Sequence, residues 1–111
     1  MSVTAASKAL ALSTVIAATM DSITVISLKT AAGELFRKIP TEVDEISPQK
    51  KQFTFWISDT EGNGNLTGLS LYGNGATTTL GTGTEMVAQA VTIKKDNTNS
   101  LTVIWTVEVT Q

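Results

Sequence analysis

The chain has 111 residues, of which 41% are hydrophobic, and its 8 basic and 10 acidic side chains give a net charge of −2. This length suits one domain with a modest core. The absence of cysteine and histidine excludes thiol nucleophiles, disulfides, common zinc sites and histidine acid–base chemistry. Because no run of Lys and Arg exceeds two residues, the positive patch of a nucleic-acid-binding protein is also missing. We therefore expect a protein that is not an enzyme, with no cofactor, no metal and no nucleic-acid partner, and we do not expect a small-molecule ligand.

Residues 1–20 are rich in alanine and carry a single charge, on Lys8. A secretory signal is disfavoured because residues 19–21 make a poor cleavage site, and a membrane span is disfavoured because Ser13 and Thr14 interrupt a short apolar run. We expect a helix over residues 5–18 or an extended arm, docked on its own domain or on a neighbour. The residues whose spacing would share one helical face are Leu12, Val15, Ile16 and Met20.

Residues 22–29 are dense in β-branched side chains, which predicts a strand. A turn at residues 31–33 leads into a short element over residues 34–39 that can pair with that strand, and Pro40 ends it. Residues 41–52 are polar and contain three acids and Pro48. We expect an exposed connector there, with its charges in solvent.

Residues 53–58 alternate in the way of a strand that is buried on one side. Phe53, Phe55 and Ile57 share one face, which makes this strand the expected spine of the core. Trp56 lies on the other face. We expect it to pack inside the protein, with presentation at an interface as the alternative.

Residues 59–65 place oxygen-bearing side chains at alternate positions, as the start of a calcium-binding loop does. The twelfth position of such a loop is Ser70, where calcium binding requires a bidentate Glu. A wide turn between two strands explains the same residues without an ion.

The stretch from residue 66 to residue 84 is organised by glycine, and seven of the eight glycines of the chain lie between Gly62 and Gly83. A strand is expected over residues 66–72, and Asn74-Gly75 is a strong signal for a tight hairpin turn. A return strand over residues 76–80 and a second bend over residues 81–84 would follow.

The last quarter of the chain predicts two strands, over residues 86–94 and 101–110, joined by a polar turn. We interpret them as one long antiparallel hairpin with a threonine-rich outer face. The chain as a whole is expected to be mainly β: a small antiparallel β-sandwich or barrel-like domain over residues 21–111, preceded by the helix or arm of residues 1–20.

A resemblance covers roughly residue 53 to the end of the chain. The runs Phe-Trp-Ile-Ser-Asp-Thr-Glu-Gly-Asn-Gly, Leu-Ser-Leu-Tyr-Gly-Asn-Gly, Leu-Gly-Thr-Gly-Thr and Lys-Lys-Asp-Asn-Thr-Asn-Ser-Leu-Thr-Val-Ile-Trp resemble small virion structural proteins of tailed bacteriophages. The step from a short β-run into Gly-Asn-Gly is similar to segments of tail-fibre, collar and baseplate-associated proteins. These motifs are structural turns and strands.

The resemblance implies a virion part that is made in the host cytoplasm and assembles in multiple copies, in contact with itself and with other virion proteins and with no membrane. Its N-terminal segment and sheet surfaces would supply the contacts. The alternatives are a capsid decoration protein and a carbohydrate-binding module at a fibre tip, which would stack sugars on the two tryptophans and Tyr72. The candidate interface residues are Val15, Ile16, Trp56 and Trp105.

Overall fold

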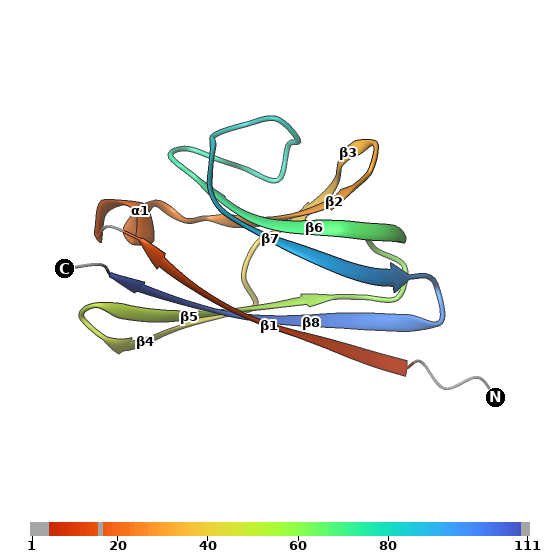
Figure 1. The fold of residues 1–111 in the computed structure, drawn as a ribbon, viewed down its shortest axis with the longest axis horizontal. Helices are drawn as coiled ribbons and strands as arrows, with labels where there is room; N and C mark the ends of the chain where they lie inside the picture. Colours follow the sequence, from red (N-terminus) through yellow and green to blue (C-terminus); the bar gives the residue numbers. More distant parts are fainter. Residues whose placement is uncertain (1–4, 16, 110–111) are drawn as a thin grey trace.

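The computed structural model describes residues 5–15 and 17–109 and shows two four-stranded sheets packed face to face (Figure 1). Sheet A has the strand order β1-β8-β5-β4, and sheet B has the order β3-β2-β6-β7. Neighbouring strands are antiparallel, except that β1 and β8 run parallel. The expected mainly β fold is confirmed as a sandwich. Its elements are β1 (Ala5–Val15), α1 (Ala17–Ser22), β2 (Val25–Thr30), β3 (Gly33–Lys38), β4 (Glu42–Ser47), β5 (Lys50–Ile57), β6 (Gly64–Gly73), β7 (Thr84–Lys95) and β8 (Asn99–Val109).

The core lies between the two sheets and follows the alternation of the sequence. Phe53, Phe55 and Ile57 on β5 are buried, as their spacing predicted. On β8 every second residue from Leu101 to Val107 is buried. Sheet B contributes aliphatic side chains from the opposite side, among them Ile26, Leu28, Leu66, Leu69 and Leu71.

The helix expected over residues 5–18 is wrong, because residues 5–15 form strand β1 and only the six residues of α1 are helical. β1 pairs with β8 along its whole length, from Ala5 opposite Asn99 to Val15 opposite Val109. An isolated helix of this length is only marginally stable, so the backbone hydrogen bonds offered by β8 decide the conformation. Leu12 is 63% exposed while Val15 is buried, so the two do not share one face.

The connector expected over residues 41–52 is wrong as an element, because the segment forms β4 and the start of β5 in a hairpin, whereas the expected exposure of its acidic side chains is confirmed. Its charges suit a strand at the edge of a sheet, where they discourage pairing with other chains. Glu45 stands opposite Lys51, and a register shift near the end of β4 bends the edge further. Pro48 falls in the turn between the two strands.

The hairpin expected from the last two strands is a third correction, because β7 pairs with β6 in sheet B whereas β8 pairs with β1 and β5 in sheet A. The polar turn after Lys95 therefore crosses from one sheet to the other. Both strands keep their apolar faces toward the core, β7 from one side and β8 from the other. Alternation predicts which face is buried, but it does not say which strand is the neighbour.

The Gly-rich segment contains the expected turn but not the expected return strand. Asn74 and Gly75 both have positive φ, 55° and 86°, as the hairpin signal requires. Residues 76–80 form no strand, and β7 begins only at Thr84. Residues 74–83 are thus a long loop between β6 and β7, and we refer to them as the covering loop.

Candidate assembly surface

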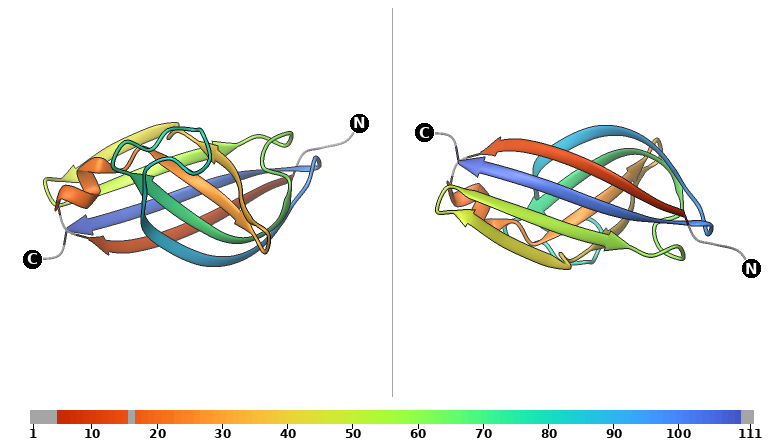
Figure 2. Two further views of the ribbon diagram at one scale, coloured as in Figure 1. Left: turned by 90° about the horizontal axis from the view of Figure 1, so that it is seen from above. Right: turned by 90° about the horizontal axis from the view of Figure 1, so that it is seen from below.

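The outer faces of the two sheets differ. Seen from above, the covering loop lies across sheet B, whereas the view from below looks directly onto the strands of sheet A (Figure 2). The short helix α1 sits at one end of the sandwich (Figure 1). We refer to the outer surface of sheet A as the open face.

Three apolar side chains form a diagonal stripe across the open face. By register, Leu12 on β1 stands beside Thr106, Ile104 on β8 beside Thr54, and Trp56 on β5 beside Thr102. Each step of the stripe moves one strand across and two residues along, which separates neighbours by about 7–8 Å. Leu12 is 63% exposed and Trp56 is 48% exposed. Large apolar side chains with this exposure and spacing are available for contact with another protein.

The surroundings of the stripe are largely uncharged. Thr54, Thr102, Thr106 and Gln52 occupy neighbouring register positions on β5 and β8. Charged residues lie mainly toward the periphery. Lys50 pairs with Glu108 at 3.1 Å near one end of the sheet, acidic residues line β4, and Lys8 occupies the register position next to Thr102 on β1.

Of the candidate interface residues that lie in the described part of the chain, Trp56 alone is available at the surface. Trp105 is completely buried, and its indole Nε1–H donates to Ser13 Oγ at 2.9 Å. Val15 is also buried, and Ile16 lies outside the described residues. Trp56 is exposed, so the expectation that it packs inside the protein is wrong, and its alternative, presentation at an interface, stays a prediction.

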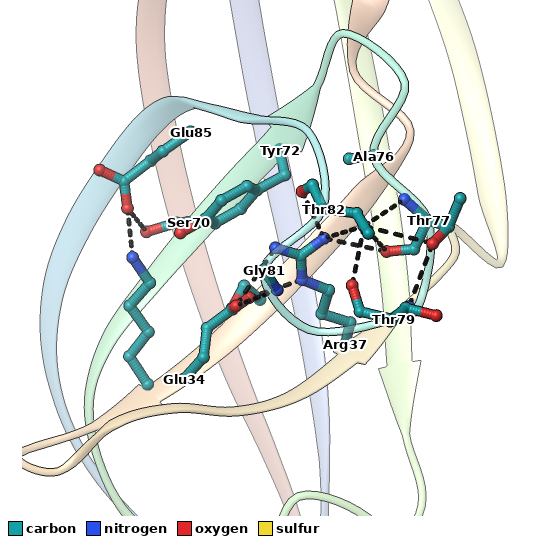
Figure 3. A network of polar contacts seen from close by, with 12 residues as sticks. Glu34, Arg37, Ser70, Tyr72, Ala76, Thr77, Thr79, Gly81, Thr82 and Glu85 are labelled. Atoms are coloured by element: carbon teal, nitrogen blue, oxygen red, sulfur yellow. Dashed lines mark hydrogen bonds and ion pairs between the residues drawn. The ribbon is translucent and has the colours of Figure 1, made fainter.

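The covering loop is fastened to sheet B by Arg37, whose side chain is fully buried (Figure 3). One terminal nitrogen of the guanidinium donates to the backbone oxygens of Thr77 and Thr82, both at 2.9 Å. Its Nε donates to Glu34 at 2.6 Å, and Glu34 in turn accepts the backbone N–H of Gly81 at 2.9 Å. Arg37 and Glu34 thus hold both halves of the loop.

A second set of contacts continues beneath the loop. The Arg37 guanidinium lies 4.2 Å from the centre of the Tyr72 ring, and the Lys29 ammonium lies 5.1 Å from it. Glu85 accepts hydrogen bonds from Lys29 and, at 2.7 Å, from Ser70 (Figure 3). Because Tyr72 is occupied by cations and Trp105 is buried, these rings do not join Trp56 in the sugar-stacking platform considered from the sequence.

The carboxylates of this network titrate below their ordinary range. Burial raises the pKa of Glu34, but hydrogen bonds from Arg37, Ser27 and the Gly81 backbone outweigh it, so the pKa is lowered overall. The hydrogen bond from Lys29 is the main reason why the pKa of Glu85 is lowered. Both groups therefore stay ionised at neutral pH and keep their cations in place.

Gly83 is required by the shape of the loop. Its φ is +71°, and a Cβ at this position would come within 2.4 Å of the Cβ of Ala76 and of the Gly73 carbonyl oxygen. Ala76, which belongs to the loop, is itself buried. The loop is therefore a packed layer over sheet B, and a larger residue at position 83 would push it off.

Two lysines bind oxygen atoms of the turn at residues 58–63. The ammonium of Lys95 donates to the Ser58 carbonyl at 2.6 Å and to Asn63 Oδ1 at 2.9 Å, while Lys38 pairs with Glu61 at 2.6 Å. Within residues 5–15 and 17–109, no group of three or more acidic side chains is placed to hold a metal ion. Lysine ammonium groups therefore contact Asn63 and Glu61, two of the side chains that resemble a calcium-binding loop in the sequence.

Several of these residues could not be identified from the sequence pattern. Arg37 follows Leu35 and Phe36 in what reads as an ordinary half-exposed strand, and the loop carbonyls that it binds lie 40 and 45 positions further along the chain. Leu12 was placed on the buried face of a helix. In the part of the chain that the structure describes, no helix is both long enough and apolar enough to cross a membrane. Comparisons with protein-family models, with curated proteins and with solved structures find no match for this chain.

Proposed function

We propose that this chain is a non-enzymatic structural subunit of a bacteriophage virion, and that its copies assemble through the open face of sheet A. The observation that supports the proposal is the difference between the two outer faces. The protein covers the outer face of sheet B over β2, β3 and β6 with its own loop, fixed by a buried arginine, and leaves an apolar stripe exposed on sheet A. A subunit that buried the stripe against a neighbour would cover the large apolar side chains of the open face.

The chemistry of the open face favours protein contact. Covering Trp56 or Leu12 fully would contribute about 1.5–3 kcal/mol each before the costs of association. The flanking threonines can hydrogen-bond across an interface without the penalty of desolvating a charge. Each contact is modest, but a closed ring or a fibre repeats it in every copy, so the assembly as a whole is stable.

The resemblance of residues 53–111 to virion proteins supports a place in the neck, tail, fibre or baseplate. Capsid decoration is a second candidate, because the same face would also fit a preformed protein shell. The two differ in isolation: a neck or tail part associates with itself, whereas a decoration protein that binds only a shell remains a monomer.

The test is the mass of the full chain in solution by light scattering, measured over a range of concentrations. We expect a defined oligomer, and we expect Trp56→Glu and Leu12→Glu to reduce it to smaller species by placing a charge in the stripe. The matched control is Leu80→Glu, because Leu80 is 46% exposed but belongs to the covering loop.

A strict monomer at all concentrations would refute self-assembly and leave decoration as the function to test against phage capsids. An oligomer that survives Trp56→Glu and Leu12→Glu but dissociates in Leu80→Glu would place the contact on the other side of the molecule. Circular dichroism of each variant checks that the sandwich remains folded.

A further inference from the structure

Asn63 and Gly64 meet a buried cation at one end of the sandwich. Gly64 begins β6 and stands opposite Lys95, the last residue of β7. Lys95 is only 2% exposed, yet its ammonium donates to Asn63 Oδ1 at 2.9 Å. Asn63 itself is exposed to solvent. The Asn63 carboxamide therefore contacts both solvent and the buried Lys95 ammonium. The next residue, Gly64, has no side chain that would hinder access to its backbone nitrogen.

We propose that Asn63 is a self-modifying residue: the backbone nitrogen of Gly64 closes on the Asn63 side-chain carbonyl, held by the Lys95 ammonium, and the product is an aspartate paired with Lys95.

The reaction needs no reagent other than water. A bond forms between the Gly64 nitrogen and Cγ of Asn63, the Cγ–Nδ2 bond breaks, and the amide group leaves as ammonia with the proton of the Gly64 nitrogen. Water then adds to the cyclic imide and opens it. Gly64 and Lys95 form the terminal pair of the β6–β7 ladder, where fraying releases the Gly64 nitrogen most easily.

Lys95 directs both steps by stabilising negative charge on the same oxygen. As the nitrogen attacks, charge develops on Oδ1, where a fixed ammonium stabilises it as an oxyanion hole does. In the second step the same contact favours attack of water at Cγ over attack at the backbone carbonyl. Opening at Cγ restores the normal main chain and gives aspartate, whereas opening at the backbone carbonyl gives isoaspartate.

The product relieves an unfavourable arrangement. Burial disfavours the charged form of Lys95 and lowers its pKa, with Asp59, Glu61 and Asp96 only partly offsetting this effect. The Ser58 carbonyl and the Asn63 amide, which accept hydrogen bonds from its ammonium, are neutral. A carboxylate at residue 63 would add a negative charge to this contact and turn the existing ammonium–amide hydrogen bond into an ion pair, which favours the charged form of Lys95.

The chain contains its own control in Asn74-Gly75. This pair is exposed in the covering loop, and its amide nitrogen donates to Thr84 Oγ1 at 3.4 Å. Among the described contacts, no cation touches its side-chain carbonyl. The two Asn-Gly pairs therefore share the local sequence Gly-Asn-Gly and differ in the ammonium and in backbone conformation, because Asn74 has a φ of 55° in its turn, so the Lys95 variants isolate the effect of the ammonium.

The experiment incubates the full chain at pH 8 and 37 °C and follows both sites by peptide mapping, with separate quantification of aspartate and isoaspartate. We expect Asn63 to yield mainly aspartate and Asn74 to yield mainly isoaspartate. Lys95→Met should slow conversion at Asn63 by roughly tenfold or more and should raise its share of isoaspartate, with no change at Asn74. Lys95→Arg, which keeps the charge, should restore the preference for aspartate.

A second measurement does not depend on the folding of any Lys95 variant. Asn63→Asp should raise the thermal unfolding temperature by a few degrees, whereas Asn74→Asp should leave it unchanged. An intact Asn63 after Asn74 has reacted would overturn the proposal. The same isoaspartate share at both sites, or no stabilisation by Asn63→Asp, would show that Lys95 does not direct the reaction.

Discussion

Arg37 illustrates how much one residue can organise. Its guanidinium is fully buried and is shared between the Glu34 carboxylate and two carbonyls of the covering loop. Removing one member of a buried, hydrogen-bonded ion pair typically costs about 3–5 kcal/mol, because the partner charge is left without compensation. The adjacent Lys38 forms a pair with Glu61 that is only half-buried.

We therefore expect Arg37→Met to lower the free energy of unfolding by about 3–5 kcal/mol in urea titrations and to accelerate amide hydrogen exchange in the covering loop. Lys38→Met is the matched control, with an expected loss of about 0–1 kcal/mol. Equal losses in the two variants would mean that Arg37 does not hold the loop.

Sequence reasoning could not find Arg37, for a physical reason. The alternation of β3 only says that Arg37 lies on the face opposite Phe36, which in a single sheet means solvent. Its burial arises because the covering loop folds back over that face. Phe53 and Phe55 needed no such information, since an aromatic alternation already implies a core.

At the scale of elements, β1 is a full member of sheet A. It pairs with β8 throughout, Val15 packs in the core, and Ser13 accepts the indole proton of Trp105. Without β1, the hydrogen-bonding edge of β8 and the indole N–H of Trp105 would lose their partners.

Deleting residues 1–15 should therefore lower the stability of the whole domain, not merely prevent assembly. Thermal unfolding followed by circular dichroism checks this, and Ser13→Ala isolates the hydrogen bond, with an expected loss of about 1–3 kcal/mol for the unsatisfied indole N–H. A truncated chain as stable as the full one would restore the picture of a detachable arm.

The elements that could be predicted are those in which one period dominates, as in β5 and β8. The segment of β1 fits a helical and a strand period equally well, so its conformation depends on a partner near the other end of the chain. The sequence did not predict that β7 and β8 belong to different sheets, because a polar turn that joins two strands of one sheet has the same composition as a turn that crosses between sheets.

At the scale of the whole molecule, three carboxylates make the free energy of unfolding depend on pH in the acid range. The hydrogen bond from Lys38 is the main reason why the pKa of Glu61 is lowered, and the pKa values of Glu34 and Glu85 are lowered as well, each from an ordinary value of 4.5. Below 4.5 the unfolded chain takes up protons at these groups before the folded chain does, so the folded state loses stability as the pH falls.

We expect the free energy of unfolding to be constant from neutral pH to about pH 5 and to decrease below an ordinary carboxylate pKa of about 4.5. Urea titrations across this range measure it. Glu34→Gln should flatten the slope more than Glu85→Gln, because the Glu85 side chain is 41% exposed and solvent screens its pair. A slope that neither variant changes would assign acid sensitivity to other groups.

The parallel pairing of β1 with β8 also bears on how the chain reaches its fold. β2 and β3 form a local hairpin and β6 joins it across a shorter loop, whereas β1 must wait for β8, which is more than 90 positions further along the chain. Closing so long a loop is slow, and contacts of high sequence separation delay folding. During synthesis on the ribosome, sheet B can therefore form while β1 is still unpaired, and the open face comes into existence only when β8 has emerged.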